Sequence, residues 1–277
     1  MIDINKIEFK KFPGGELHIT NSWIMDASTA NFTLDDKVIC RIQNSDDLMK
    51  LCLFTDAYKR NFGVLFPELI LPYIPYARQD RVAANGEALS IKVFANILNS
   101  LGYKRVTVLD PHSDVSTALI DNIFVVPQNM VFRNVLLNLL DENKRIDLIS
   151  PDAGALKKVY KLTNIGPKTI SKNIRIGAKH RDTQTGEITG TTVDGTAEAK
   201  TAIVVDDICD GGRTFIELAK VVRNEYDKLI LCVTHGIFSK GLDILLEFYD
   251  EIYTTNSWNP LLESDKNLHV LKVESDI

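Results

Sequence analysis

The fold is decided by one stretch in the second half of the chain, Ala202-Ile203-Val204-Val205-Asp206-Asp207-Ile208-Cys209-Asp210-Gly211-Gly212-Arg213-Thr214-Phe215. Its first four residues are apolar and mostly β-branched, as in a buried strand, and two acids follow directly. After a turn that contains glycine, apolar residues recur at helical spacing over residues 214–224. A strand, a turn and a helix in this order are typical of an α/β protein with a parallel sheet.

The same alternation runs through the rest of the chain. Runs rich in β-branched residues predict strands at 37–41, 68–73, 105–109, 146–149, 202–205, 228–233 and 251–254. Apolar residues at helical spacing predict helices at 46–60, 90–101, 129–140 and 214–224. Two polar stretches, 78–87 and 179–196, interrupt the pattern, and we expect them to form loops or hairpins. This alternation predicts mostly parallel sheets flanked by helices.

The length of 277 residues favours two domains. Residues 106–110 and 203–207 are both apolar strands that end in acid, which indicates two domains of one fold. The predicted domains are 1–140 and 141–277.

Composition and charge exclude several classes of protein. Lys and Arg together number 32 and Asp and Glu 37, so the net charge is −5 and no broad positive field exists to bind nucleic acid or an anionic membrane. The apolar stretch 63–77 is broken by proline and Glu68, so no membrane-spanning helix is predicted. The first residues do not form a secretory signal, which predicts a cytoplasmic location. The four cysteines have no CxxC spacing, so we expect buried reduced thiols rather than disulfides or a zinc site.

The deciding stretch also carries a candidate phosphate site. Carboxyl ends of parallel strands line the ligand crevice of an open sheet, and a helix N-terminus favours an anion. Glycine lets backbone amides approach phosphate, and paired acids accept hydrogen bonds from vicinal sugar hydroxyls. A plain strand-to-helix turn capped by an Asp is the alternative. The predicted ribose-phosphate site consists of Asp206, Asp207, Asp210, Gly211, Gly212, Arg213 and Thr214.

This stretch resembles the phosphoribosyl-diphosphate-binding motif of type I phosphoribosyltransferases and, more closely, that of ribose-phosphate diphosphokinases. Segments in the matching order also resemble diphosphokinase signatures: NSDDLM at 44–49, YARQDR at 76–81, SPDAGA at 150–155 and THGIFS at 234–239. The resemblance covers almost the whole chain. It implies two tandem phosphoribosyltransferase-like domains, and a reaction in which ATP and Mg²⁺ transfer a diphosphoryl group to the anomeric hydroxyl of ribose 5-phosphate, releasing AMP.

The resemblance also implies roles for single residues. Arg78 and Gln79 would hold ATP, because a guanidinium binds phosphate and an amide can read an adenine edge. His112 would act in catalysis and contact Mg²⁺ or ATP oxygens, and Asp152 would be a metal or ribose ligand. A solvated charged turn at 78–81 and a structural histidine are the alternatives.

Two further segments take their roles from the family. Lys179 and Arg181 match the basic pair that opens its mobile catalytic loop, and they would stabilise the charge of the migrating group. Phe12 and Glu16 match a stretch that contacts the adenine of ATP on a neighbouring subunit, which leads us to expect a homo-oligomer.

The chain departs from the family pattern in the phosphate loop, where Gly211 replaces Thr and Arg213 replaces Gly. Loss of a hydroxyl and gain of a cation indicate that the acceptor could be a 5-substituted relative of ribose 5-phosphate, such as ADP-ribose of NAD metabolism. A phosphoribosyltransferase shares the acidic loop but does not explain residues 78–81 or His112. A non-catalytic nucleotide-binding regulatory homologue is the other alternative.

Overall fold

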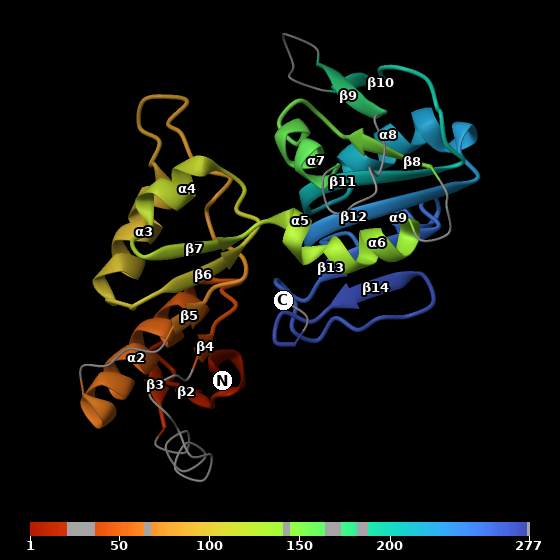
Figure 1. The fold of residues 1–277 in the computed structure, drawn as a ribbon. Helices are drawn as coiled ribbons and strands as arrows, with labels where there is room; N and C mark the ends of the chain where they lie inside the picture. Colours follow the sequence, from red (N-terminus) through yellow and green to blue (C-terminus); the bar gives the residue numbers. More distant parts are fainter. Residues whose placement is uncertain (21–36, 64–67, 141–144, 164–172, 182–187, 276–277) are drawn as a thin grey trace. The chain divides into compact units, whose positions relative to one another are not determined.

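The computed structural model describes residues 1–277 except 21–36, 64–67, 141–144, 164–172, 182–187 and 276–277, and it describes no side chain from 179 to 189. The described residues form two compact units, Met1–Val126 and Pro127–Ile277 (Figure 1). The sequence placed the boundary after residue 140. Residues 128–140 pack with the second unit, where the Nε2 atom of Gln128 donates to the main-chain oxygen of Asp206 at 2.6 Å.

The first unit is built on a parallel sheet with the order β1-β4-β5-β6-β7. Its strands are β1 (Ile2–Asp3), β4 (Lys37–Ile39), β5 (Glu68–Ile70), β6 (Val106–Leu109) and β7 (Ile123–Val126). A separate antiparallel pair consists of β2 (Phe9–Lys11) and β3 (Leu17–Ile19). The helical segments are η1 (Ile4–Lys6), α2 (Ser45–Phe62), α3 (Ser90–Ser100) and α4 (Asp114–Leu119).

Helix α2 begins where its sequence signal predicts and extends two residues beyond the predicted end at residue 60. The side chain of Asn44 accepts a hydrogen bond from the backbone N–H of Asp47 at 3.1 Å, and this bond satisfies one of the helix's unpaired amides. The helix ends at Gly63, whose φ of 81° suits glycine. Its buried side chains, including Leu51 and Phe54, belong to a core that also contains residues of α3, β4, β5 and β6.

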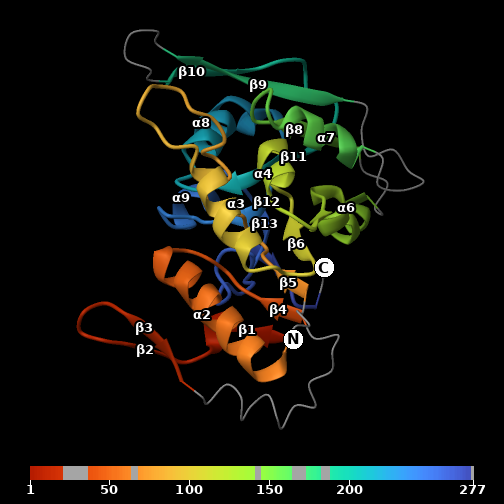
Figure 2. The same ribbon diagram turned by 90° about the vertical axis from the view of Figure 1, so that its left-hand side faces the viewer.

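The second unit is built on a seven-stranded sheet with the order β10-β9-β8-β11-β12-β13-β14. All its neighbours pair in parallel except β9 and β10, which form an antiparallel hairpin (Figure 2). The strands are β8 (Ile146–Ser150), β9 (Ile174–Arg181), β10 (Ile188–Val193), β11 (Thr201–Cys209), β12 (Lys228–Gly236), β13 (Glu251–Thr255) and β14 (Leu268–Leu271). The helical segments are α5 (Gln128–Val131), α6 (Arg133–Leu140), α7 (Leu156–Leu162), α8 (Arg213–Val222), η2 (Arg223–Glu225) and α9 (Asp243–Leu246).

Helix α8 covers one face of the second sheet. Its buried residues Phe215, Leu218 and Val222 recur at helical spacing and belong to the same core as Val204 of β11 and Leu231 of β12. This packing fixes the start of α8 close to the end of β11, with three residues between them in the chain. The turn between the two is therefore held in place from both sides.

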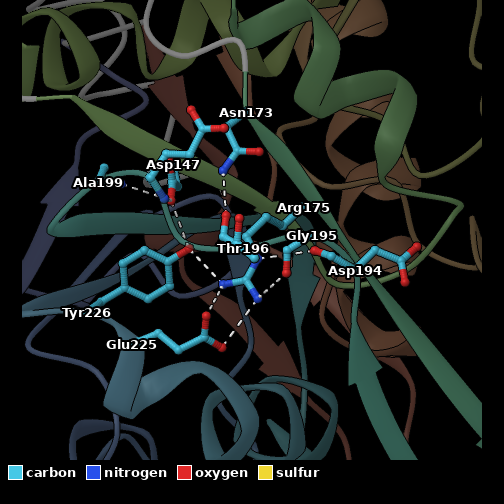
Figure 3. A network of polar contacts seen from close by, with 10 residues as sticks. Asp147, Asn173, Arg175, Asp194, Gly195, Thr196, Ala199, Glu225 and Tyr226 are labelled. Atoms are coloured by element: carbon cyan, nitrogen blue, oxygen red, sulfur yellow. Dashed lines mark hydrogen bonds and ion pairs between the residues drawn. The ribbon is translucent and has the colours of Figure 1, made fainter.

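A buried polar network fastens the amino edge of this sheet (Figure 3). Arg175 at the start of β9 donates to the carbonyls of Asp194 at 3.1 Å and Gly195 at 3.2 Å, and it pairs with Glu225 at 2.9 Å. Its Nη1 atom also donates to the Tyr226 hydroxyl, which in turn donates to the Oδ2 atom of Asp147 at 3.0 Å. Asp147 accepts from the backbone N–H groups of residues 198 and 199. The network joins β8, β9, the segment between α8 and β12, and the segment that leads into β11.

These observations confirm the predicted α/β fold with mostly parallel sheets. Cys40, Cys209 and Cys232 are buried and Cys52 is half-buried, all as free thiols, as expected. Burial raises the pKa of the Cys209 thiol to about 12, so this thiol is unreactive at neutral pH. Among the described residues, no helix combines the length and apolar character that crossing a bilayer requires.

Candidate active site

Three carboxylates meet at the carboxyl edge of the second sheet. Asp206 and Asp207 lie on β11, and Asp152 lies in the turn after the neighbouring strand β8. The Oδ1 atom of Asp206 accepts from the backbone N–H of Asp207 at 2.8 Å. Lys158 of α7 forms an ion pair with Asp207 at 2.9 Å. Burial, followed by the charges of Asp207 and Asp152, raises the pKa of the Asp206 carboxyl well above its usual value. Negative charge is therefore crowded at this edge.

Asp152 is held in a fixed orientation by its own turn. Its Oδ1 atom accepts from the backbone N–H groups of Gly154 at 3.0 Å and Ala155 at 3.2 Å. The hydroxyl of Ser150 donates to its main-chain oxygen at 2.6 Å. The carboxylate is thus positioned before any ligand binds.

The turn after β11 leads from the acids to the N-terminus of α8. Gly212 is the N-cap, and it has a φ of 76° that favours glycine. A Cβ atom at this position would lie 3.1 Å from the Cδ2 atom of Leu245. The first amides of a helix have no acceptor within the helix, and they favour an anion. Arg213 is exposed and Thr214 half-buried at this helix start.

A second turn holds this loop from outside. The hydroxyl of Ser239 donates to the Oδ1 atom of Asp210 at 2.7 Å, and its backbone N–H donates to the main-chain oxygen of Asp210 at 3.2 Å. The segments 206–214 and 234–239, which the sequence analysis selected separately, are therefore in contact. The predicted loop residues lie together at one edge of the sheet.

Strand β9 runs past the end of β8 and lies close to the turn that carries Asp152. A Cβ atom on Gly177 would lie only 2.6 Å from the carbonyl oxygen of Pro151, so this approach requires glycine. Lys179 and Arg181 follow on β9, where their backbones pair with Thr191 and Ile188 of β10. Their side chains lie outside the described residues, so their catalytic roles stay predictions.

Candidate ATP residues lie at the carboxyl edge of the first sheet. The turn that carries Arg78 and Gln79 follows β5, and His112 follows the neighbouring strand β6. Both Arg78 and His112 are exposed. Partial burial disfavours the charged form of Asp80, but Arg81, Ser113 and His112 outweigh it and hold the pKa of this carboxyl below its usual value. The two turns are therefore close to each other.

The backbone beside His112 is strained. Asp110 is buried and has a φ of 35°, which is uncommon for a residue other than glycine. Its N–H donates to the carbonyl of Val126 at 2.9 Å, so pairing with β7 holds it in this conformation. Strain of this kind is concentrated at functional sites.

Phe12 and Glu16 lie apart from these turns in the sequence, in the turn that connects β2 to β3. The N–H of Phe12 donates to the carbonyl of Glu16 at 2.8 Å, and both side chains are exposed. Their role in binding ATP stays a prediction.

The carboxylates at the carboxyl edge of the second sheet suit a cation such as Mg²⁺, which also binds water and phosphate oxygens. In the part of the chain that the structure describes, no group of three or more His, Cys, Asp or Glu side chains is arranged to hold a metal ion. Mg²⁺ needs only one or two carboxylates together with water and phosphate oxygens. The carboxylates of Asp152 and Asp206 fit such an ion, because a divalent cation would relieve the repulsion between them.

Some residues of this edge were missed by the sequence analysis. Lys158 neutralises Asp207, Gln128 supports Asp206, and Gly177 permits the approach of β9. None of them belongs to a motif, and their positions depend on contacts between distant segments. Only the three-dimensional structure identifies them.

Comparison with known proteins decides the family. Residues 1–102 match a family model described as the N-terminal domain of ribose phosphate pyrophosphokinase. The ribose-phosphate pyrophosphokinase of Nostoc sp. is 30% identical over 274 residues, which are 96% of this chain and 78% of that protein. The corresponding protein of Thermosipho africanus is 30% identical over 84% of this chain and 72% of its own length. The chain belongs to the ribose-phosphate pyrophosphokinase family.

The predicted family, a family of enzymes, is thus confirmed. The relative from Mycoplasmopsis pulmonis is 31% identical, and the match covers 77% of this chain but 65% of that protein. A crystal structure of phosphoribosylpyrophosphate synthetase from Mycobacterium smegmatis has a TM-score of 0.78 and covers 96% of this chain and 86% of its own. At 23% identity, this likeness shows that the ribose-phosphate pyrophosphokinase fold extends over both units.

Proposed function

We propose that this protein transfers the diphosphoryl group of ATP to the anomeric hydroxyl of ribose 5-phosphate and releases AMP. The observation that carries the proposal is the edge of the second sheet, where a carboxylate pair precedes a glycine turn and a helix N-terminus. Membership of the ribose-phosphate pyrophosphokinase family supports it. In the reaction, the anomeric oxygen forms a bond to the β-phosphorus and loses its proton to solvent. The bond from that phosphorus to the α-phosphate oxygen breaks.

The acceptor would be held by the second unit. The 210–214 turn would bind the 5-phosphate through backbone amides and the hydroxyl of Thr214. Asp206 and Asp207 would accept hydrogen bonds from the ribose hydroxyls.

ATP would be bound by residues from the other motifs. Arg78 and Gln79 would hold its phosphates and base, with Phe12 and Glu16 contacting adenine, and the last two imply a homo-oligomer as partner. His112 and Asp152 are the residues proposed to hold Mg²⁺, which supplies neutralisation of phosphate charge when bound. Lys179 and Arg181 would stabilise the migrating group, because phosphoryl-type transfer depends on positioning and charge neutralisation. The cytoplasmic location stays a prediction from the sequence.

A second acceptor follows from the altered loop. Arg213 adds a planar cation beside the phosphate turn, so ADP-ribose, which carries a diphosphate, is the alternative acceptor. AMP formation with each sugar offered separately decides between them. A clear preference for ribose 5-phosphate would remove ADP-ribose.

The decisive experiment measures AMP by mass spectrometry after incubation with ATP, Mg²⁺ and either acceptor. We expect Lys179→Ala to lose AMP formation and to keep ATP binding. Lys200→Ala is the matched control, since Lys200 is an exposed lysine at the amino end of β11. A wild-type protein that binds ATP without forming AMP would be a regulatory homologue. Consumption of the sugar diphosphate with a nucleobase would indicate a phosphoribosyltransferase.

A further inference from the structure

A lysine outside every motif lies against the predicted acceptor loop. A Cβ atom on Gly211 would be 3.7 Å from the Cε atom of Lys240 and 3.8 Å from its Cδ and Cγ atoms. The aliphatic part of Lys240 therefore lies over the face of Gly211, where a larger residue would carry its side chain. This contact joins the turn after β12 to the turn after β11.

The turn that carries Lys240 is fixed by its own bonds. Ser239 is bonded to Asp210 through its hydroxyl and its backbone N–H. The N–H of Gly241 donates to the carbonyl of Phe238 at 2.8 Å, and these two residues have φ values of 83° and 49°. A left-handed residue on each side of Lys240 closes the turn tightly. The base of the Lys240 side chain is therefore held beside the loop.

The charges around the loop are unbalanced. In the described part of the chain, neither Lys240 nor Arg213 has a hydrogen-bond or ion-pair partner, and both are exposed. Lys158, by contrast, is paired with Asp207 at 2.9 Å. Two unpaired cations thus flank a turn whose amides favour an anion.

We infer that Lys240 is a specificity-determining residue, whose ammonium group contacts the phosphoryl end of the acceptor bound at the 210–214 turn. This inference rests on the proposed function, because it takes that turn as the acceptor's phosphate site. It also explains the departure at Gly211. The hydroxyl of a threonine at that position is replaced by the ammonium group of Lys240, so a neutral donor is exchanged for a charged one.

The test compares Lys240→Met with Lys266→Met, which removes the same charge. Lys266 is exposed and lies just before β14, at the opposite edge of the sheet. We expect Lys240→Met to raise the KM for ribose 5-phosphate about tenfold, the effect of losing one charge-assisted hydrogen bond. The kcat and the KM for ATP should not change. Lys240→Arg should restore most of the affinity, and Lys266→Met should behave as the wild type.

Calorimetry with ribose 5-phosphate and no ATP separates this inference from the proposed activity. A weaker affinity in Lys240→Met alone supports the inference even if the wild type forms no AMP. Equal affinity in the two methionine variants would overturn it. No binding of ribose 5-phosphate by the wild type would overturn both proposals.

Discussion

We expect Gly177→Ala to lower the free energy of unfolding of the second unit. The new Cβ would lie 2.6 Å from the carbonyl oxygen of Pro151 and 3.1 Å from the Cδ1 atom of Leu218. The first distance is about 0.4 Å below the shortest contact that real Cβ atoms make. Backbone must move to relieve it, and such overpacking costs about 1–3 kcal/mol. Replacing glycine in a strand gains about 0.5–1 kcal/mol, so we expect a net loss of about 1–2 kcal/mol.

The matched control is Gly190→Ala on β10, in the same hairpin. A Cβ atom at Gly190 would meet nothing within 4 Å, so this variant should be as stable as the wild type or slightly more so. Urea unfolding followed by circular dichroism measures the free energy of unfolding of both variants. In thermal unfolding, each kcal/mol that is lost should lower the melting temperature by about 2–4 °C. Because Gly177 also aligns β9 with the turn of Asp152, we expect Gly177→Ala to lower kcat. Equal unfolding midpoints for the two variants would refute the reasoning.

Three further changes test other parts of the structure. Asp206→Asn should stabilise the protein at pH 8 by about 1 kcal/mol, because functional residues often reduce stability. It should also remove part of the pH dependence of the free energy of unfolding. The pKa of Asp206 is raised in the folded state, so this residue destabilises the fold increasingly as the pH rises from the unfolded-state pKa near 4 through the folded-state pKa. Unfolding midpoints at pH 5 and pH 8 check this, and an equal change in midpoint between the two pH values for wild type and variant would contradict it. Tyr226→Phe should cost about 1–3 kcal/mol, since it leaves Arg175 and Asp147 each without one buried bond, whereas Tyr160→Phe at an exposed position should change little in thermal unfolding. Chelation of Mg²⁺ with EDTA should abolish AMP formation and added Mg²⁺ should restore it; activity that survives EDTA would remove the metal from the proposal.

The sequence predicted elements best where one local signal was sufficient. The cap at Asn44 and the apolar face of α8 depend on residues within one or two turns, and both lie where expected. The helix predicted at 129–140 is interrupted at Phe132, whose φ of −98° and ψ of 10° end α5 before α6 begins. Periodicity alone could not show this break, because the apolar pattern continues across it.

Tertiary pairing explains the elements that the sequence missed. Strand β11 was expected to end at residue 205, yet it continues to Cys209, because its pairing with β12 extends to Gly236. The acids Asp206 and Asp207 therefore lie within the strand and not after it. Strand β9 was overlooked because it is supported by pairing with β8 and by the network of Arg175.

The difference between local signals and contacts of distant segments also explains which residues of the candidate site the sequence predicted. Motifs located the acidic turn, the residues near His112 and the Asp152 turn, since each is a continuous segment. Lys240 and Gln128 influence those segments from elsewhere in the chain, so no spacing rule could find them.

The Arg175 network lies at one edge of the second sheet and the acidic turn at the other. The network that secures this edge of the sheet is thus remote from the turn that we propose to bind the acceptor. An exposed residue of the turn such as Arg213 can be exchanged without loosening this network, so a single substitution there can change the preference for the proposed acceptor. A scaffold divided in this way is well suited to diversification by mutation.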